Sequence, residues 1–234
     1  MRGIFRVLLT LGTVWLLAGC PRPALHPTPG EQGPQPLPPP DLRGAVLYEV
    51  NPQDSLVNIL VYRGGPLARL GHNHVMTVRQ LAGRVWLHPD ARKSGFSLSF
   101  PVAALVVDDP EARRAAGDEF PPEIPAADRE GTRRNMLRPE VLDGGRYPEI
   151  RLQAAQPGGV SPATHLMVRI TLKGMSRDIP VTAAVAVSGT RLTATGEFDL
   201  LQSDFGIQPF SAGLGALQVQ DRLRVRFKVS ADKG

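Results

Sequence analysis

The chain of 234 residues contains a single cysteine, Cys20, and only 6% aromatic residues. One cysteine excludes an internal disulfide and any site built from several thiolates, such as a structural zinc site or an iron–sulfur cluster. Hydrophobic residues make up 42% of the chain and charged residues 21%, which excludes a disordered chain and leaves enough apolar side chains for a core. The composition therefore indicates a globular protein that folds without disulfides.

The sequence contains a short apolar run near its start. The apolar run at 7–18, VLLTLGTVWLLA, follows a positively charged segment with Arg2 and Arg6. It is shorter than the roughly 20 residues that a membrane-spanning helix needs. A basic start before a short apolar run is typical of a secretory signal peptide. We therefore predict a signal peptide at 1–19.

The run ends in Leu17-Ala18-Gly19-Cys20, which resembles the bacterial lipobox, where small residues precede a cysteine that is acylated after cleavage. The only cysteine of the chain stands at the one position where this chemistry operates. Several acyl chains, each contributing about 0.8 kcal/mol per buried CH₂, hold a protein stably at a membrane. We predict a lipid anchor at Cys20, on the periplasmic side of the inner or the outer membrane of a bacterial cell envelope.

A proline-rich segment follows the predicted anchor. Residues 21–40 contain nine prolines in twenty positions, and such a chain is semi-rigid, extending about 3.1 Å per residue. The segment 20–40 is therefore predicted to be a tether, with a ligand for a PxxP-binding domain as the alternative. Residues 41–234 contain no second low-complexity break and are predicted to form one domain.

The domain shows the two-residue alternation of half-buried strands. In 219–229, for example, Val225, Phe227 and Val229 alternate with Arg224 and Arg226. Similar patterns predict strands over 45–50, 57–61, 75–87, 96–100, 150–152, 166–172, 179–185 and 192–200. Eight or nine strands that are each apolar on one face must form a sandwich or close into a barrel.

The segment 108–146 interrupts the strand pattern. It opens on Asp108-Asp109-Pro110, whose aspartates we interpret as turn residues, and an irregular stretch follows. A short helix is predicted from about Ala126 to Leu137, and a second one from Pro139 to Gly144-Gly145. A long, partly helical insertion between strands is expected to form a lid over a barrel mouth.

The pair His72 and His74 is the sharpest chemical feature of the sequence. On a strand this spacing places both rings on one face, about 6–7 Å apart, close enough to share a zinc or copper ion. A further ligand would be needed, and sequence does not place His88, His165, Asp204 or Asp221 beside the pair. The other interpretation is that both histidines lie at a barrel mouth and bind backbone groups or the headgroup of a ligand.

Motifs for catalysis and for nucleic-acid binding are missing. The sequence has no HExxH or Gly-x-Ser-x-Gly element, and acylation of Cys20 would leave no thiol nucleophile, so we predict no catalytic residue and no enzyme. The formal charge is +5, but no basic stripe is interleaved with aromatics, so no nucleic-acid partner is predicted. We interpret Arg129, Arg133, Arg134 and Arg138 as a solvated helix face, with a clamp for an anionic headgroup or acidic lipid as the alternative.

Four motifs occur in a fixed order. They are Gly71-His72-Asn73-His74-Val75, Tyr147-Pro148-Glu149-Ile150, Leu172-Lys173-Gly174-Met175-Ser176-Arg177, and Gly196-Glu197-Phe198 through Ser203-Asp204-Phe205-Gly206-Ile207. This order resembles the YceI family of bacterial envelope proteins over 45–231. The first motif departs from the commoner family pattern, which has one histidine there instead of Gly-His-Asn-His.

The resemblance implies a mainly β fold, a lipocalin-like antiparallel barrel of about eight strands that holds a long apolar molecule such as a polyisoprenoid or a fatty-acid derivative. A chain of about twenty carbons would gain about 16 kcal/mol on burial, against an association cost of about 4–15 kcal/mol. The predicted lining residues are the inward-facing positions Val57, Ile59, Phe96, Leu98, Phe100, Leu166, Val168, Ile170, Val181, Phe198 and Phe227.

Periodicity alone does not separate a hollow barrel from one whose interior these side chains fill. Two functional hypotheses therefore follow from the sequence. The first is a membrane-anchored protein that sequesters or transports a long-chain apolar ligand. The second is a zinc- or copper-binding envelope enzyme or stress protein that uses His72 and His74.

Overall fold

The computed structural model describes residues 35–156 and 158–234, and the predicted signal peptide and Cys20 lie outside these ranges. The strands are β1 (Val46–Val50), β2 (Leu56–Gly64), β3 (His74–Val78), β4 (Ala82–Leu87), β5 (Gly95–Pro101), β6 (Leu105–Val107), β7 (Glu149–Gln156), β8 (Thr164–Leu172), β9 (Met175–Ser188), β10 (Arg191–Leu201), β11 (Ser211–Ala212) and β12 (Leu217–Lys233). The α-helices are α1 (Pro110–Ala116) and α2 (Ala126–Met136), and the 3-10 turns are η1 (Ala68–Leu70), η2 (Ala91–Lys93), η3 (Val102–Ala104) and η4 (Ser203–Phe205). No helix in the described ranges is long and apolar enough to cross a membrane.

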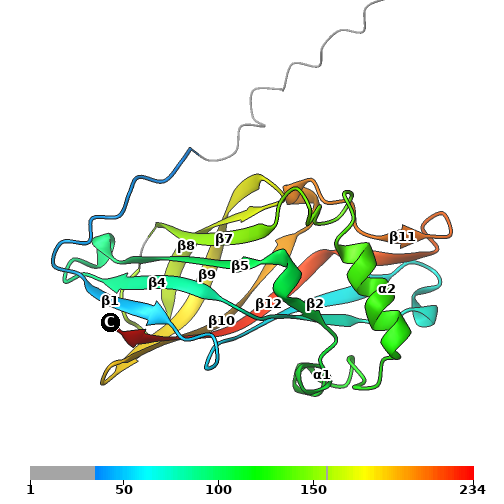
Figure 1. Ribbon diagram of the computed structural model, residues 1–234, viewed down its shortest axis with the longest axis horizontal. Helices are drawn as coiled ribbons and strands as arrows, with labels where there is room; N and C mark the ends of the chain where they lie inside the picture. Colours follow the sequence, from blue (N-terminus) through cyan, green and yellow to red (C-terminus); the bar gives the residue numbers. More distant parts are fainter. Residues whose placement is uncertain (1–34, 157) are drawn as a thin grey trace, which may run out of the picture. The chain divides into compact units, whose positions relative to one another are not determined.

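Eight strands close a barrel (Figure 1). Their order is β1-β4-β5-β7-β8-β9-β10-β12, and β1 returns to pair with β12, where Tyr48 lies opposite Lys233. Every strand pair in this circuit is antiparallel. The predicted mainly β fold, an antiparallel lipocalin-like barrel of about eight strands, is therefore confirmed.

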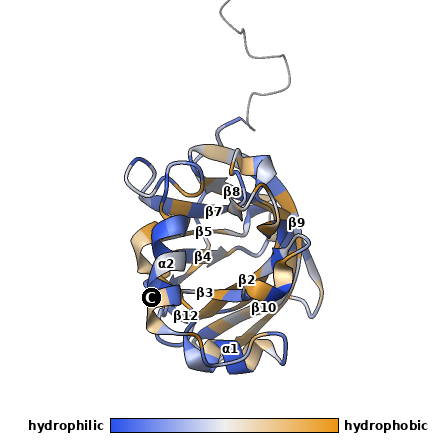
Figure 2. Cartoon of the chain, turned by 90° about the vertical axis from the view of Figure 1, so that its right-hand side faces the viewer, coloured by the Kyte–Doolittle hydropathy of each residue, from blue (hydrophilic) through white to orange (hydrophobic). Residues whose placement is uncertain are grey.

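The long strand β12 pairs with two strands along one of its edges. Its C-terminal end pairs with β1, whereas residues 218–228 pair with β2. From β2 the ladder continues through β3 to β6. Helix α2 lies beside this branch (Figures 1 and 2), and Arg133 fastens it there by donating to the carbonyls of Leu105 and Ala103 at 2.8 and 3.0 Å. The predicted helical lid thus contributes to the barrel wall next to an edge strand.

Helix α1 covers the outer face of β2 and β3. Leu60 and Val75 alternate with the inward-facing residues of these strands, yet both are fully buried. They pack instead against Ala112 of α1 and against Phe120, in a cluster separate from the main core. A second, smaller core therefore lies outside the barrel wall.

The segment 108–146 differs from the sequence prediction in two places. Asp109 is the N-cap of α1, because its carboxylate accepts from two backbone N–H groups of the first turn, and Pro110 occupies that turn. This helix was expected to be irregular chain. Helix α2 matches the predicted one closely, but the predicted second helix after Pro139 is wrong. There the N–H of Leu142 donates to the carbonyl of Met136 at the end of α2, the N–H of Asp143 donates to the carbonyl of Arg138, and the segment forms consecutive turns.

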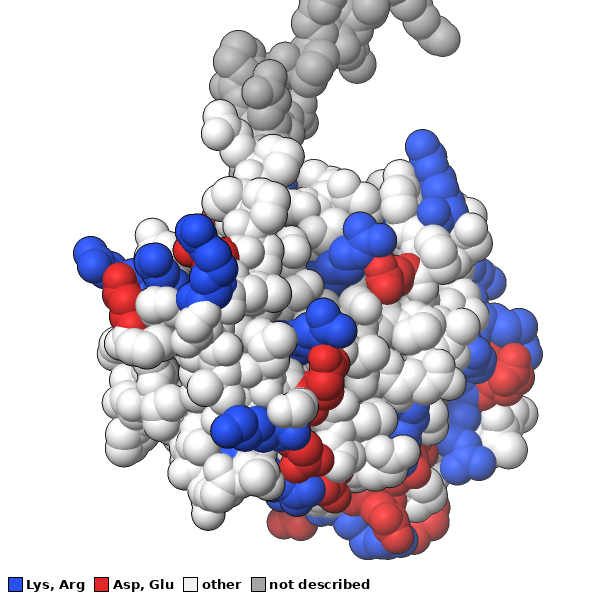
Figure 3. Space-filling model, turned by 60° about the vertical axis from the view of Figure 1, so that its left-hand side comes forward, with Lys and Arg blue, Asp and Glu red and all other residues white. Residues whose placement is uncertain are grey.

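The alternation in β12 has the expected consequence on both faces. Arg224 and Arg226 point outward, opposite Asp199 and Glu197 of β10, and the two ion pairs measure 3.0 and 3.4 Å. On the face shown in Figure 3, basic and acidic side chains are likewise interspersed. Such surface pairs contribute about 0–1 kcal/mol each. Arg224 and Arg226 of β12 are thus paired with acidic residues on the neighbouring strand.

Candidate functional site

The barrel interior contains two cavities, of about 220 and about 130 Å³. The first lies at the α2 end and the second between β4, β5, β8, β9 and β10. Five residues border both cavities, namely Val57, Phe100, Leu152, Phe198 and Val225. The cavities are therefore neighbours along the barrel, and this ring of apolar side chains separates them.

The eleven residues predicted to line a ligand site all border these cavities. Three of them, Val57, Phe100 and Phe198, belong to the shared ring. The first cavity adds Ile59 and Ile170, and the second adds Phe96, Leu98, Leu166, Val168, Val181 and Phe227. The interior thus holds two voids instead of a continuously filled core, while contact of these residues with a ligand stays a prediction.

The first cavity has a polar side and the second does not. Four polar side chains line the first cavity: His74, Thr132, Asn135 and Gln202. Every lining residue of the second cavity within the described ranges is apolar or glycine. The pair of cavities is therefore polarised along the barrel, with one end suited to a polar group and the other to hydrocarbon.

Helix α2 supplies half of this polar side. Thr132, Asn135 and Met136 are spaced three and four residues apart, which places them on one face of the helix, and all three border the first cavity. The two hydrogen bonds of Arg133 hold the helix with this face inward. Gln202 enters from the end of β10, where its amide donates to the carbonyl of Gln220 at 2.8 Å.

Asp108 is the centre of a buried network beside the first cavity. Its Oδ2 accepts from Nδ1 of His74 at 2.7 Å, and its Oδ1 accepts from the backbone N–H of Val75 at 2.9 Å and from Arg113 at 2.5 Å. An ionised carboxylate only accepts, so the Nδ1–H of His74 points to Asp108. Nε2 is then the ring nitrogen of His74 that is left for a ligand.

Arg113 is a fully buried member of this network. The side chains of Arg113 and Asp108 expose no surface. Arg113 also donates to the carbonyls of Asn73 and Pro121 at 2.7 and 2.5 Å, and its guanidinium lies 6.0 Å from the ring centroid of Phe120. Within the described part of the chain, its Nη2 is the buried side-chain atom that lacks a hydrogen-bond partner. Helix α1 therefore places a buried cation behind His74. The hydrogen bonds of this cation hold the backbone at Asn73 and at Pro121.

Asp108 itself adopts a left-handed backbone conformation, with φ of 54°. This region is disfavoured for residues with a side chain, although aspartate tolerates it better than most. Burial opposes ionisation of Asp108, but its hydrogen bonds with His74 and Val75 and the charge of Arg113 outweigh this, so its pKa lies below the usual range. The carboxylate is thus held in its charged form.

The lowered pKa of Asp108 predicts an acid-sensitive contribution to stability. The unfolded chain binds the proton more readily than the folded one, so this contribution is complete above the unfolded pKa of about 4 and is lost as the pH falls below it. We expect the free energy of unfolding in urea to fall less steeply between about pH 5 and pH 3 in Asp108→Asn than in the wild type. An equal pH dependence of the free energy of unfolding in the two proteins would contradict a lowered pKa for Asp108.

His72 and His74 lie close together but differ in environment. The ring centroids are 6.3 Å apart, and His72 is exposed and precedes β3, whereas His74 begins it. The described residues contain no group of three or more His, Cys, Asp or Glu side chains placed to hold a metal ion. A zinc or copper site on this pair therefore stays a prediction without a third ligand in the described ranges.

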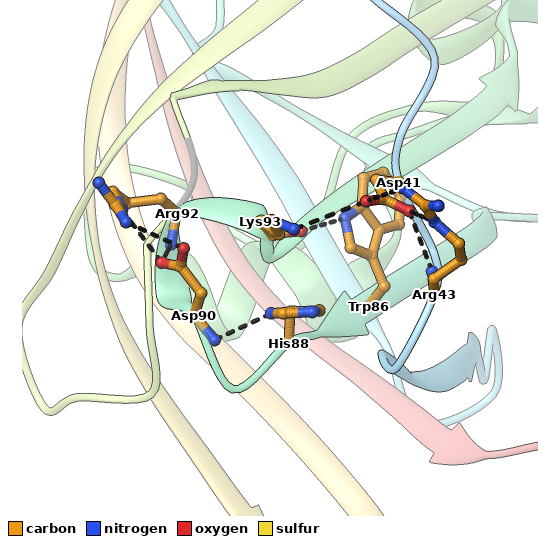
Figure 4. A network of polar contacts seen from close by, with 7 residues as sticks. All are labelled: Asp41, Arg43, Trp86, His88, Asp90, Arg92 and Lys93. Atoms are coloured by element: carbon orange, nitrogen blue, oxygen red, sulfur yellow. Dashed lines mark hydrogen bonds and ion pairs between the residues drawn. The ribbon is translucent and has the colours of Figure 1, made fainter.

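The other histidines considered as ligands are engaged elsewhere. In the polar network around η2 (Figure 4), Nδ1 of His88 accepts from the backbone N–H of Asp90 at 2.9 Å, and the indole N–H of Trp86 donates to the carbonyl of Lys93 at 3.0 Å. His165 lies 3.1 Å from the hydroxyl of Thr182. Asp221 bonds the backbone N–H of Ser203.

The sequence patterns do not identify five residues of this site: Asp108, Arg113, Thr132, Asn135 and Gln202. The Asp-Pro pair at the start of α1 is a helix-start signal that can be recognised in the sequence. The spacing of Thr132 and Asn135 likewise indicates that they share one face of α2. Nothing in the sequence indicated that Arg113 would be buried, because arginine is almost never fully buried unless it is paired.

Three of the four sequence motifs pack against one another. Lys173-Gly174 forms the two-residue turn between β8 and β9, with φ of 51° and 75°. A Cβ on Gly174 would meet the ring of Tyr147 at 2.6 Å, so only glycine fits there. Nζ of Lys173 donates to the carbonyls of Glu140 and Gly206 at 3.0 and 3.2 Å. These motifs therefore hold together the loops beside the first cavity.

Comparison with known proteins agrees with this architecture. The sequence pattern of the YceI-like domain matches residues 48–231. The chain belongs to the YceI-like family. This family consists of β-barrels that bind hydrophobic ligands, a binding-protein fold that is not typically enzymatic.

One solved structure shares the fold of this chain, and another is reported for its similarity. BcnA of Burkholderia cenocepacia superposes with a TM-score of 0.55 at 16% identity, over 78% of this chain and 99% of its own. The Campylobacter jejuni YCEI protein, at 10% identity, covers 68% of this chain and 84% of its own, with a TM-score of 0.49. No curated protein matches the chain significantly.

Proposed function

We propose that this protein is a lipid-anchored envelope protein that binds a long-chain apolar ligand inside its barrel, for sequestration or transport. The observation that carries the proposal is the pair of neighbouring cavities that share a ring of apolar side chains. Their combined volume lies within the roughly 300–1,000 Å³ that is usual for ligand pockets, near its lower end. A slim chain that passes between the ring side chains would occupy both.

The proposal predicts that affinity depends on chain length. Each methylene that enters the barrel contributes about 0.8 kcal/mol, or about fourfold in Kd. We expect calorimetric titration with saturated chains of 10 to 20 carbons, run in parallel as alcohols and as carboxylates, to give a Kd that falls with length until the second cavity is filled. A Kd that is independent of length in both series would contradict binding inside the barrel.

The tether is the second part of the proposal. Cys20 follows a short apolar run, and a proline-rich segment separates it from the first strand. Acyl chains at Cys20 would hold the protein at the periplasmic side of the inner or the outer membrane. We expect the full-length protein to sediment with membranes and Cys20→Ser to move to the soluble fraction with its barrel intact. A Cys20→Ser protein that stays membrane-bound would overturn this anchor.

A further inference from the structure

We infer that the ligand carries an uncharged polar head, a hydroxyl or a carbonyl, and not a phosphate or a carboxylate. The inference rests on the proposed function and specifies its ligand. Among the described residues that line either cavity, none is Lys, Arg, Asp or Glu. An anionic head inside the barrel would leave water without meeting a cation, which is strongly unfavourable.

The polar groups that do line the first cavity suit a neutral head. Thr132 and Asn135 offer a hydroxyl and a carboxamide from one face of α2, and neither side chain forms a hydrogen bond within the described part of the protein. His74 adds Nε2, because Asp108 engages Nδ1. These groups can donate to a carbonyl and can both accept from and donate to a hydroxyl.

Three cations near this end of the barrel are committed to other partners. The guanidinium of Arg133 donates to the carbonyls of Leu105 and Ala103. Arg113 is fully buried against Asp108, and Lys173 bonds two backbone carbonyls. No lysine or arginine of the described ranges lines the first cavity, so a phosphate there would lack the counter-charge of such a side chain.

The difference in polarity between the two cavities also sets the orientation of the ligand in the barrel. The second cavity has no polar side chain in its described lining, so the hydrocarbon tail occupies it. The head remains with His74, Thr132 and Asn135 at the α2 end. Figure 2 views the barrel from this end, with α2 in front of the strands.

The test compares three probes with the same 18-carbon tail: octadecanol, octadecanoic acid and octadecyl phosphate, delivered from cyclodextrin at pH 7.5. We expect octadecanol to bind at least tenfold more tightly than either anion. Tighter or equal binding of octadecyl phosphate would overturn the inference but leave the proposed function standing. Failure of all three probes to bind would instead remove the proposed function, and this inference with it.

Substitutions of the polar residues that line the first cavity test whether these residues bind the head of the ligand. Thr132→Val and Asn135→Leu are expected to weaken octadecanol binding by about five- to tenfold each, while octadecane binding is kept or improved. Asn135→Lys should reverse the order and favour octadecyl phosphate. The matched control is Thr182→Val, which changes an exposed threonine on β9 and should leave all affinities unchanged. Unaltered octadecanol affinity in both Thr132→Val and Asn135→Leu would overturn the assignment.

Discussion

Replacing Asp108 with Asn is expected to destabilise the protein by about 3–5 kcal/mol. The substitution leaves the buried guanidinium of Arg113 without a counter-charge, and removing one partner of a fully buried ion pair has an effect of this size. It also releases His74, which loses an ionised acceptor. Urea unfolding followed by circular dichroism measures the difference.

Two further variants separate the lost charge pair from general disturbance. The double variant Asp108→Asn with Arg113→Met removes both charges and should be more stable than Asp108→Asn alone. Glu130→Gln breaks an exposed ion pair of 3.6 Å with Arg134 and should change stability by less than about 1 kcal/mol. An Asp108→Asn protein as stable as Glu130→Gln would show that the buried network does not hold this part of the fold.

Ala194→Phe is expected to weaken the binding of long chains strongly while the barrel stays folded. Ala194 borders the second cavity, so a phenyl ring there fills space that the ligand tail would occupy. Excluding about four methylenes removes about 3 kcal/mol of binding energy, roughly a hundredfold in Kd. Calorimetric titration with 10- and 20-carbon alcohols measures the effect, and the shorter chain should lose little.

The control for this prediction lies on the neighbouring strand. Ala184 of β9 is exposed and follows the inward-facing Ala183. Ala184→Phe adds the same side chain to the outer surface and should bind both alcohols as the wild type does. Equal affinity of Ala194→Phe and Ala184→Phe for the 20-carbon alcohol would place the tail outside the second cavity.

The set of residues that face the barrel interior was predictable because alternation is a local property of a strand. Phe96, Leu98 and Phe100, for example, follow one another at every second position, and once the strands close into a barrel such residues must face the same interior. The same reasoning gave the outward row of β12 with Arg224 and Arg226. The existence of voids was not predictable in this way, because it depends on how far the side chains of opposite walls reach.

The polar side of the site depends on contacts between distant segments, and this is why the sequence did not reveal it. Asp108 and Arg113 are charged, which predicts exposure, and only their mutual contact beneath α1 makes burial favourable. Helix α1 has seven residues, too few for a periodic pattern. The segment after Pro139 has a good helix start, but its N–H groups donate to the carbonyls of Met136 and Arg138 instead.

The most direct test of the account is the content of the barrel in the native protein. Protein purified in mild detergent from its own cell membranes is denatured and extracted, and the extract is quantified by mass spectrometry against the protein. The account predicts close to one long-chain molecule with an uncharged head per chain, and a much lower content in Ala194→Phe prepared in the same way. A folded wild-type protein that releases no long-chain molecule, and takes none up when long chains are added, would contradict it.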